Sequence, residues 1–443
     1  MFDKKIVQLT NSEVGHTLNT GQVFSANNEW IVFDHRNNDG DIKITGSIGI
    51  VNTKTGEERT IYKTTNQTAH GPGVGAASFS PVTDRVIFIQ GIRNADAQKP
   101  YDFTRRTGVA IDIDKPGQPI FMDARSLDKP YTIGALRGGT HAHSWSGDGE
   151  MISYTYNDYV IEQLAKTDAR VKDLRTIGLM FPKKVVVANL ANLENNDGEM
   201  FSVLAATVVE NPVAGSNEID KAFDECWIGK DGYIKADGTR QRKAIAFQGN
   251  VKNANGETIT EIFVSDIADD LTQSNFNDNA AGTATTRPAV PSQITQRRVT
   301  FMANLSQSLG KGAKGPRFWL RSSADGSRIF FLSEDDKGIV QAYSVSSNAL
   351  NGGEIKQVTN NDFSIASPIN ISPDGLYLSY IADQSVFITA ISSGISQRLT
   401  PKYQAPEKLN GAVVWSNDGS KIAYNRYVKS ENGVFLQVFL LTK

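Results

Sequence analysis

The hydrophobic and polar positions of the chain repeat one pattern, in which two short apolar stretches flank a tight polar turn. The clearest copies are Ser372-Pro373-Asp374-Gly375 before Tyr377-Leu378-Ser379-Tyr380, and Ser416-Asn417-Asp418-Gly419 before Lys421-Ile422-Ala423-Tyr424. Asp-Gly and Asn-containing pairs accept the backbone angles of a hairpin turn, and the flanking Ile, Leu and Tyr residues favour strands. The pattern therefore predicts a series of antiparallel β-hairpins.

The hairpins recur at the spacing of a repeat fold. Six copies carry a serine at the start of the turn, namely Ser25, Ser80, Ser146, Ser323, Ser372 and Ser416. Neighbouring serines are separated by 44 to 66 residues, except for 177 residues between Ser146 and Ser323, which leaves room for one more unit and inserted chain. A four-stranded unit every 40–50 residues is typical of a β-propeller blade. We predict an all-β fold, a single seven-bladed β-propeller domain over residues 1–443.

The ends of the chain are expected to meet in one blade. A strand at about Lys5 to Thr10 comes before the first hairpin, and the last blade takes its other strands from the residues after 410. We predict that the N-terminal strand completes this blade and closes the ring, because a closed ring leaves no free strand edge.

Three stretches depart from the repeat. Apolar positions at helical spacing predict a helical insertion at about 158–182, and Asn217 to Trp227 is predicted to form a short capped helix in a second insertion at about 210–240. The chain from Asn275 to Gln296 is rich in Asn, Ala, Thr and Pro, which favours an irregular crossing at about 270–296.

Composition excludes several classes of protein. The chain has 46 Lys and Arg residues against 48 Asp and Glu residues, which is not the basic excess of a nucleic-acid-binding protein. The sequence contains no stretch of 18 apolar residues, so no membrane-spanning helix is predicted. The single cysteine, Cys226, excludes an intrachain disulfide. The start lacks the apolar core of a secretory signal, so a cytoplasmic location is expected for the sequence as written, and a periplasmic one if a signal peptide was removed.

The histidines are expected on one face of the propeller. The inner strand of each blade runs along the central channel, so the serine turns lie on one face (the serine-turn face) and the crossings between blades on the other (the crossing face). His16, His70, His141 and His143 fall in crossings of the first three blades. Residues 141 and 143 of a strand point to the same side, so both reach one divalent ion, with His70 as a third ligand. The alternative is that each is an ordinary loop histidine.

Guanidinium groups are expected on the crossing face as well. The candidates for binding an acidic ligand are Arg36, Arg93, Arg105, Arg106 and Arg137. Arginine binds carboxylate or phosphate through two hydrogen bonds, although an exposed arginine is often only a solvated surface group. The tract Tyr154-Thr155-Tyr156-Asn157-Asp158 ends a strand at the same rim, where Tyr156 and Asn157 add stacking and hydrogen bonding. The predicted ligand is therefore a small acidic molecule.

The turns resemble the repeats of TolB-type propellers over almost the whole chain. The stretch Gly138-Gly139-Thr140-His141-Ala142-His143-Ser144 resembles the Gln-x-x-His-x-His segment of oligogalacturonate lyases, seven-bladed propellers that hold a manganese ion in the channel mouth, with Gly138 in the place of the glutamine. The overall layout is similar to an uncharacterised bacterial propeller family related to these lyases. The resemblance implies that His141 and His143 bind a divalent metal such as manganese.

Two functions follow from these residues. In the first, a metal-bound oligouronide undergoes β-elimination, with His16 or an arginine as the base and Arg105 or Arg137 holding a second carboxylate. In the second, the propeller is not an enzyme and binds a sugar or a protein partner through its crossing face. The second function agrees with Gly138 in the glutamine position and with the absence of an obvious carboxylate base.

Overall fold

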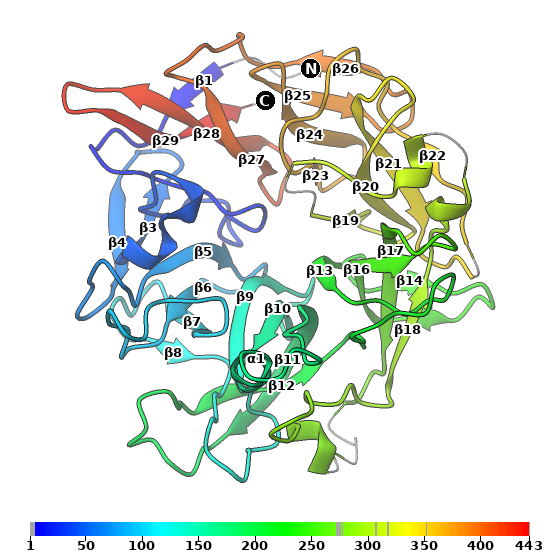
Figure 1. Cartoon of the computed structure of the whole chain (residues 1–443). Helices are drawn as coiled ribbons and strands as arrows, with labels where there is room; N and C mark the ends of the chain where they lie inside the picture. Colours follow the sequence, from blue (N-terminus) through cyan, green and yellow to red (C-terminus); the bar gives the residue numbers. More distant parts are fainter. Residues whose placement is uncertain are drawn as a thin grey trace.

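The chain forms a ring of seven antiparallel sheets (Figure 1). The computed structural model describes residues 5–271, 276, 278–305, 308–316, 319–350 and 352–442. The sheets follow one another around the ring in sequence order, and the colours of Figure 1 run once around it. The seven-bladed β-propeller predicted from the spacing of the serines is confirmed.

The first three blades carry the residues of main interest. The first contains β2 (Trp30–Asp34), β3 (Ser47–Asn52) and β4 (Glu58–Lys63); the second contains β5 (Val74–Phe79), β6 (Arg85–Gly91), β7 (Arg106–Asp112) and β8 (Ile120–Phe121); and the third contains β9 (Gly138–Trp145), β10 (Ile152–Asp158), β11 (Thr176–Val185) and β12 (Gly198–Leu204).

The remaining four blades complete the ring. The fourth contains β13 (Ala222–Trp227), β16 (Lys243–Lys252), β17 (Thr258–Ile267) and β18 (Ile294–Arg298); the fifth contains β19 (Arg321–Ser322), β20 (Arg328–Glu334), β21 (Val340–Ser346) and β22 (Lys356–Gln357); the sixth contains β23 (Asn370–Ile371), β24 (Tyr377–Ala382), β25 (Ser385–Ala390) and β26 (Ser396–Arg398); and the seventh contains β27 (Leu409–Trp415), β28 (Lys421–Lys429) and β29 (Val434–Thr442). A small hairpin, β14 (Tyr233–Ile234) and β15 (Arg240–Gln241), lies outside the blades.

The N-terminal strand closes the ring as predicted. β1 (Lys5–Gln8) pairs antiparallel with β29 as the outermost strand of the seventh blade, in a register that runs from Lys5 opposite Thr442 to Gln8 opposite Phe439 (Figure 1). Apolar faces of neighbouring blades then pack on one another, and a single core cluster contains Val438 of the seventh blade, Ile31 of the first and Phe79 of the second.

The repeated serines stabilise the blade turns directly. In the third blade, Ser146 Oγ donates a hydrogen bond to Asp148 Oδ1 over 2.6 Å and accepts one from the Met151 amide over 2.9 Å. The same two contacts, to the residue two positions later and from the amide five positions later, recur at Ser25, Ser323, Ser372 and Ser416. A hydroxyl group that donates and accepts at once explains why the turns share this residue.

Of the two helical predictions, one was right in part and the other was wrong. Helix α1 (Tyr159–Ala165) is present, but residues 176–182 belong to β11, whose first six residues are all buried. A strand covered on both faces is continuously apolar, so its sequence also satisfies a helical spacing. Residues 222–227 form β13, the inner strand of the fourth blade, and not the predicted helix.

The crossing before β18 contains a short 3-10 helix, η2 (Asp278–Ala281), while Asn275 and Asn277 lie outside the described residues. Three further 3-10 helices are η1 (Asp39–Ile44), η3 (Met302–Asn304) and η4 (Ser308–Lys311). Within the described ranges, no helix is both long and apolar enough to cross a membrane.

Candidate functional site

A β-bulge interrupts the inner strand of three consecutive blades. In β5, β9 and β13 two residues stand opposite one residue of the next strand, and the first of each pair has a positive φ: Ala76 at 56°, Ala142 at 59° and Asp224 at 52°. Residues other than glycine rarely adopt this conformation. A bulge redirects the side chains that follow it, and bulges are enriched next to functional sites.

The bulge in β9 separates the two histidines of the His-x-His segment. His143 is buried, its Nε2 lies 3.0 Å from Thr140 Oγ1, and a Cβ atom on Gly108 would lie 2.7 Å from it. His141 is partly exposed, and its ring centroid lies 6.2 Å from that of Phe103. The expectation that both side chains point to the same side assumed a regular strand, and Ala142 breaks that regularity.

Both imidazoles are held neutral. Burial is the main cause that lowers the pKa of His143 to about 3, and the nearby Arg106 lowers it further. Burial, Arg106 and Arg175, in this order, lower the pKa of His141 well below its usual range. Each ring is therefore uncharged at neutral pH, and each has an Nδ1 atom that is buried without a hydrogen-bond partner.

Two guanidinium groups lie beside His141 without a carboxylate partner. Arg106 begins β7 and Arg175 directly precedes β11, so both extend from loops at the crossing face. Arg106 Nη1 donates to the Tyr101 hydroxyl over 2.9 Å, its Nη2 has no partner, and Arg175 Nε donates to Asn157 Oδ1 over 3.2 Å. Within the described part of the chain, neither forms an ion pair, and burial lowers the pKa of both.

The Phe103 ring covers both of these cations. Its centroid lies 4.5 Å from Arg106 Cζ and 5.3 Å from Arg175 Cζ, while 55% of the residue stays exposed. A Cβ atom on Gly139 would lie 2.0 Å from the Phe103 carbonyl oxygen, so this glycine lets the loop pack directly on β9. The electron-rich face of an aromatic ring attracts a cation. The Phe103 ring here occupies the position that the counter-ion of a buried arginine usually takes.

Carboxyl groups with raised pKa values border this cluster. Burial raises the pKa of Asp173 to about 6, although its carboxylate accepts hydrogen bonds from Asn157 Nδ2 (2.8 Å) and the Asp158 amide (3.0 Å). Burial also raises the pKa of Asp224 to about 6 and that of Glu225 to about 8. These are the two bulge residues of β13, and both titrate near neutral pH.

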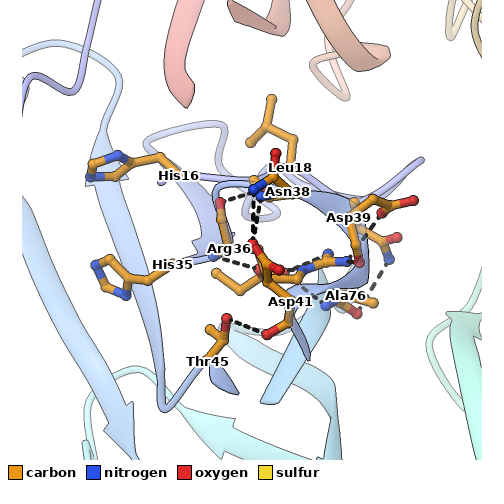
Figure 2. A network of polar contacts seen from close by, with 12 residues as sticks. His16, Leu18, His35, Arg36, Asn38, Asp39, Asp41, Thr45 and Ala76 are labelled. Carbon is orange, nitrogen blue, oxygen red and sulfur yellow. Dashed lines mark hydrogen bonds and ion pairs between the residues drawn. The ribbon is translucent and has the colours of Figure 1, made fainter. Parts of the chain in front are cut away.

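Several arginines that were predicted to bind the ligand form contacts within the protein instead. Arg36 is buried, its Nε donates to Asp34 Oδ1 over 2.6 Å, and its Nη1 lies 3.2 Å from Asp39 Oδ1 (Figure 2). Arg105 Nη2 pairs with Glu194 Oε1 over 2.7 Å. Arg93 is exposed, and its Nη2 donates to a backbone oxygen over 3.3 Å.

Arg137 and Tyr156 belong to a second buried network. Arg137 Nη2 contacts Asp158 Oδ2 over 2.7 Å, and the Tyr156 hydroxyl donates to the same oxygen over 3.1 Å. Both side chains are fully buried, so they hold β10 and the crossing before β9 together. Of the predicted ligand-binding residues, Asn157 does reach the cluster, through its bond to Arg175.

The remaining histidines have other contacts. His16 is buried, and its Nε2 contacts Glu58 Oε2 over 3.2 Å and Ser12 Oγ over 3.1 Å. Figure 2 shows the side chains of His16 and His35 turned away from the Arg36–Asp39 contacts, and their ring centroids are 5.6 Å apart. His70 is exposed in the crossing between the first two blades.

The metal-ligand set predicted from the sequence does not fit the structure. Over the described residues, no three His, Cys, Asp or Glu side chains are grouped as ligands of a metal ion. His143 Nε2 is engaged by Thr140, and His70 stands exposed in a crossing. We therefore derive no chemical step through an ion at His70, His141 and His143.

The sequence interpretation missed Arg175, Phe103 and the acidic pair of β13. Asp224 and Glu225 lay in the segment predicted as a helix, and Arg175 lay in the predicted helical insertion. The sequence did contain one signal for Phe103. It lies three residues before Arg106, so an aromatic residue is close to an arginine that was predicted to bind the ligand.

Sequence comparisons relate the chain to proteins of unknown function. A family model described as a protein of unknown function (DUF3748) matches residues 73–195, which include Phe103, Arg106, His141 and Arg175. The uncharacterized protein YidR of Escherichia coli strain K12 is 33% identical over 425 residues, or 95% of each chain.

Two solved propellers are similar in structure. An oligogalacturonate lyase in complex with manganese has a TM-score of 0.54 at 12% identity, over 100% of this chain and 93% of that one. TolB from Acinetobacter baumannii has a TM-score of 0.39 at 13% identity, over 98% and 86% of the two chains. At 12% identity the likeness to the lyase shows the fold alone.

Proposed function

The chain belongs to the family of the Escherichia coli protein YidR, and from this premise we propose that its crossing face binds an acidic oligosaccharide and cleaves it by β-elimination. The observation that carries the proposal is the pair Arg106 and Arg175, two guanidinium groups that form no ion pair among the described residues and lie beside the neutral His141. The propeller likeness to an oligogalacturonate lyase supports the choice of an oligouronide as the substrate.

The two arginines suit the carboxylate of a uronic acid. A guanidinium group binds a carboxylate through parallel charge-assisted hydrogen bonds, and Arg106 Nη2 has no other partner. Buried cations without a counter-ion are unfavourable, so an anion placed between Arg106 and Arg175 stabilises both. Phe103, exposed at the same place, offers a ring on which the apolar face of a sugar stacks.

β-Elimination of a uronide removes the proton from the carbon next to the carboxylate. The proton passes to the base, the electron pair of that C–H bond forms a carbon–carbon double bond, and the glycosidic carbon–oxygen bond breaks. The leaving oxygen takes up a proton from water. Negative charge builds up on the carboxylate during this step, where Arg106 and Arg175 stabilise it. His141, and not the buried His16, is the base in this proposal, because it is neutral and partly exposed.

The substrate itself prepares His141 for this role. Arg106 and Arg175 both contribute to its low pKa in the free protein. A bound carboxylate offsets their positive charge, which raises the pKa of the imidazole and favours proton transfer only when the substrate is present. No step requires a metal ion, so the manganese named for the structural neighbour has no part in this scheme.

The same low pKa favours a second candidate, a binding protein without catalytic activity. A base whose pKa is held far below neutral accepts protons weakly. If the bound carboxylate does not offset both arginines, the site still holds an acidic sugar but does not cleave it.

One experiment separates the two candidates. Calorimetry measures binding of oligogalacturonate, and ultraviolet absorbance follows the unsaturated uronate that β-elimination forms. We expect Arg106→Gln and Arg175→Gln to weaken binding about tenfold to hundredfold, because a hydrogen bond to a charged group contributes about 1.5–3 kcal/mol. Arg93→Gln, at an exposed arginine, serves as the matched control.

His141→Gln tests the chemistry separately, since it is expected to keep binding and to abolish the unsaturated product. Binding without any product in the wild type rejects β-elimination and leaves the binding protein. If oligogalacturonate does not bind at all, both candidates fail.

A further inference from the structure

A short segment of the first blade crosses the central channel near the serine-turn face. Gln22, with a φ of 54°, exchanges two hydrogen bonds with the Trp145 backbone in the third blade, over 2.8 and 2.9 Å. Asn19 donates to Ser78 of the second blade, and the Thr20 carbonyl oxygen accepts from Arg321 (2.6 Å) and Asn370 (2.9 Å). Residues 19–22 therefore link the second, third, fifth and sixth blades to the first.

A cavity of about 250 Å³ lies beside this segment, inside the ring. Its lining comes from six blades, and it includes Glu225, Trp227, Trp319 and Arg321. The two indole side chains and the guanidinium group are partly exposed, so they have free surface within the channel. A space of this size is slightly smaller than the pockets that hold drug-sized ligands. It has the dimensions of one small organic molecule.

Arg321 gives this cavity a cation with spare hydrogen-bond donors. Among the described residues its hydrogen bonds go to Asn370 Oδ1 (2.7 Å), the Leu320 carbonyl oxygen (2.8 Å) and the Thr20 carbonyl oxygen (2.6 Å). A guanidinium group has five N–H donors, so two have no acceptor among the described residues. Burial lowers the pKa of Arg321, and within the described ranges it forms no ion pair. An anion is the ligand that completes its hydrogen bonding.

The walls around Arg321 specify the rest of the ligand. Trp227 is fixed by a bond from its Nε1 to the Ser144 carbonyl oxygen (2.9 Å), so its ring is a rigid surface. Indole rings bind flat, weakly polar faces such as a sugar ring or an aromatic ring. The carboxyl group of Glu225 has a pKa raised to about 8 by burial, so it adds no negative charge at neutral pH.

We propose that this cavity is a second binding site, for a monosaccharide-sized organic carboxylate held by Arg321 against Trp227 and Trp319. Its cation is Arg321 and not the Arg106 and Arg175 pair, although Glu225 borders both, and the proposal does not depend on the function proposed for that pair. Two classes of ligand, a sugar acid and an aromatic acid, have the required features: one carboxylate and a ring with a flat face.

Tryptophan fluorescence tests the proposal, because Trp145, Trp227 and Trp319 line the cavity and only Trp30 and Trp415 lie elsewhere. The whole protein is titrated with D-glucuronate, with benzoate and with glucose as the uncharged control. We expect a saturable change with at least one carboxylate and none with glucose. The two acids distinguish a sugar body from an aromatic one.

Variants locate the binding. Arg321→Gln is expected to weaken it at least tenfold, whereas Arg106→Gln leaves it unchanged. If Arg321→Gln fails to fold, Trp319→Leu, at a partly exposed position, is expected to weaken binding instead. The proposal is overturned if neither acid produces a saturable change, if glucose binds equally well, or if Arg106→Gln abolishes the signal while Arg321→Gln does not.

Discussion

The guanidinium carbon of Arg106 lies 4.5 Å from the centroid of the Phe103 ring, in the place where most buried arginines of this chain have a carboxylate. Arg36, Arg105 and Arg137 each pair with a carboxylate at 2.6 to 2.7 Å. In the proposed function, the counter-ion of Arg106 is the bound substrate carboxylate, which has to displace or share the Phe103 ring.

Replacing Phe103 tests this relationship. Phe103→Ala removes the ring from both Arg106 and Arg175, and two cation–π contacts contribute about 1–2 kcal/mol together at exposed sites. We expect small anions such as sulfate to bind about fivefold to thirtyfold more tightly, as measured by calorimetry. Phe103→Leu keeps an apolar cover without a π system and should give an intermediate affinity. Unchanged sulfate affinity in Phe103→Ala would show that the ring does not compete with anions.

The fold was predictable because its signals are local. Each serine bonds within its own turn, between residues two and five positions apart, so the repeat is legible in the sequence. Two of the buried ion pairs are not local in this sense. Arg105 meets Glu194 of the next blade, and Arg137 meets Asp158 on the neighbouring strand, so the sequence does not reveal that these arginines are already neutralised.

The orientation of the histidines was not predictable for a related reason. Ala142 and Ala76 adopt positive φ although alanine carries no turn signal, because pairing on both sides of the bulge determines their conformation. Side-chain direction in β9 therefore depends on a backbone irregularity that composition does not show.

Ring closure makes a prediction about stability. Deleting residues 1–8 removes β1, whose Val7 packs against the core cluster shared by the seventh, first and second blades. We expect a clearly lower melting temperature and reversible association, because β29 then exposes a free edge. Thermal unfolding and light scattering measure both effects. Lys5→Ala, at an exposed position of the same strand, should change neither, and a deletion variant as stable as the wild type would contradict closure by β1.

The low pKa of His143 predicts that the free energy of unfolding falls in acid. Its pKa is about 3 in the native state and about 6.5 when unfolded, so between these values the unfolded state binds a proton that the native state does not. The free energy of unfolding therefore falls as the pH drops below 6.5, by up to about 2 kcal/mol at pH 5.

His143→Gln keeps a partner for Thr140 and removes the titration, so urea unfolding at pH 7 and pH 5 should show a smaller acid loss in this variant. His70→Gln, at an exposed histidine, should behave like the wild type. Equal acid losses in His143→Gln and the wild type would mean that His143 titrates normally in the native state.

The raised pKa of Glu225 predicts the opposite dependence of the free energy of unfolding on pH. Burial raises its pKa to about 8 in the native state, against 4.5 for the free side chain, so the native state keeps a proton that the unfolded state releases between these values. The free energy of unfolding therefore falls as the pH rises from about 4.5 to about 8, by about 1.4 kcal/mol per pH unit at most.

Glu225→Gln imitates the protonated acid and should remove this slope, which makes the variant more stable than the wild type at pH 8.5. Urea unfolding at pH 6 and pH 8.5 measures the difference, with Glu150→Gln as the exposed control. Glu225 and Arg321 line the same cavity, so Glu225→Gln should bind an organic carboxylate more tightly than the wild type at pH 8.5, where the wild type carries a negative charge in the lining. Asp224, the carboxyl group that acts on Arg321, is ionised in both proteins at this pH, so the comparison isolates Glu225.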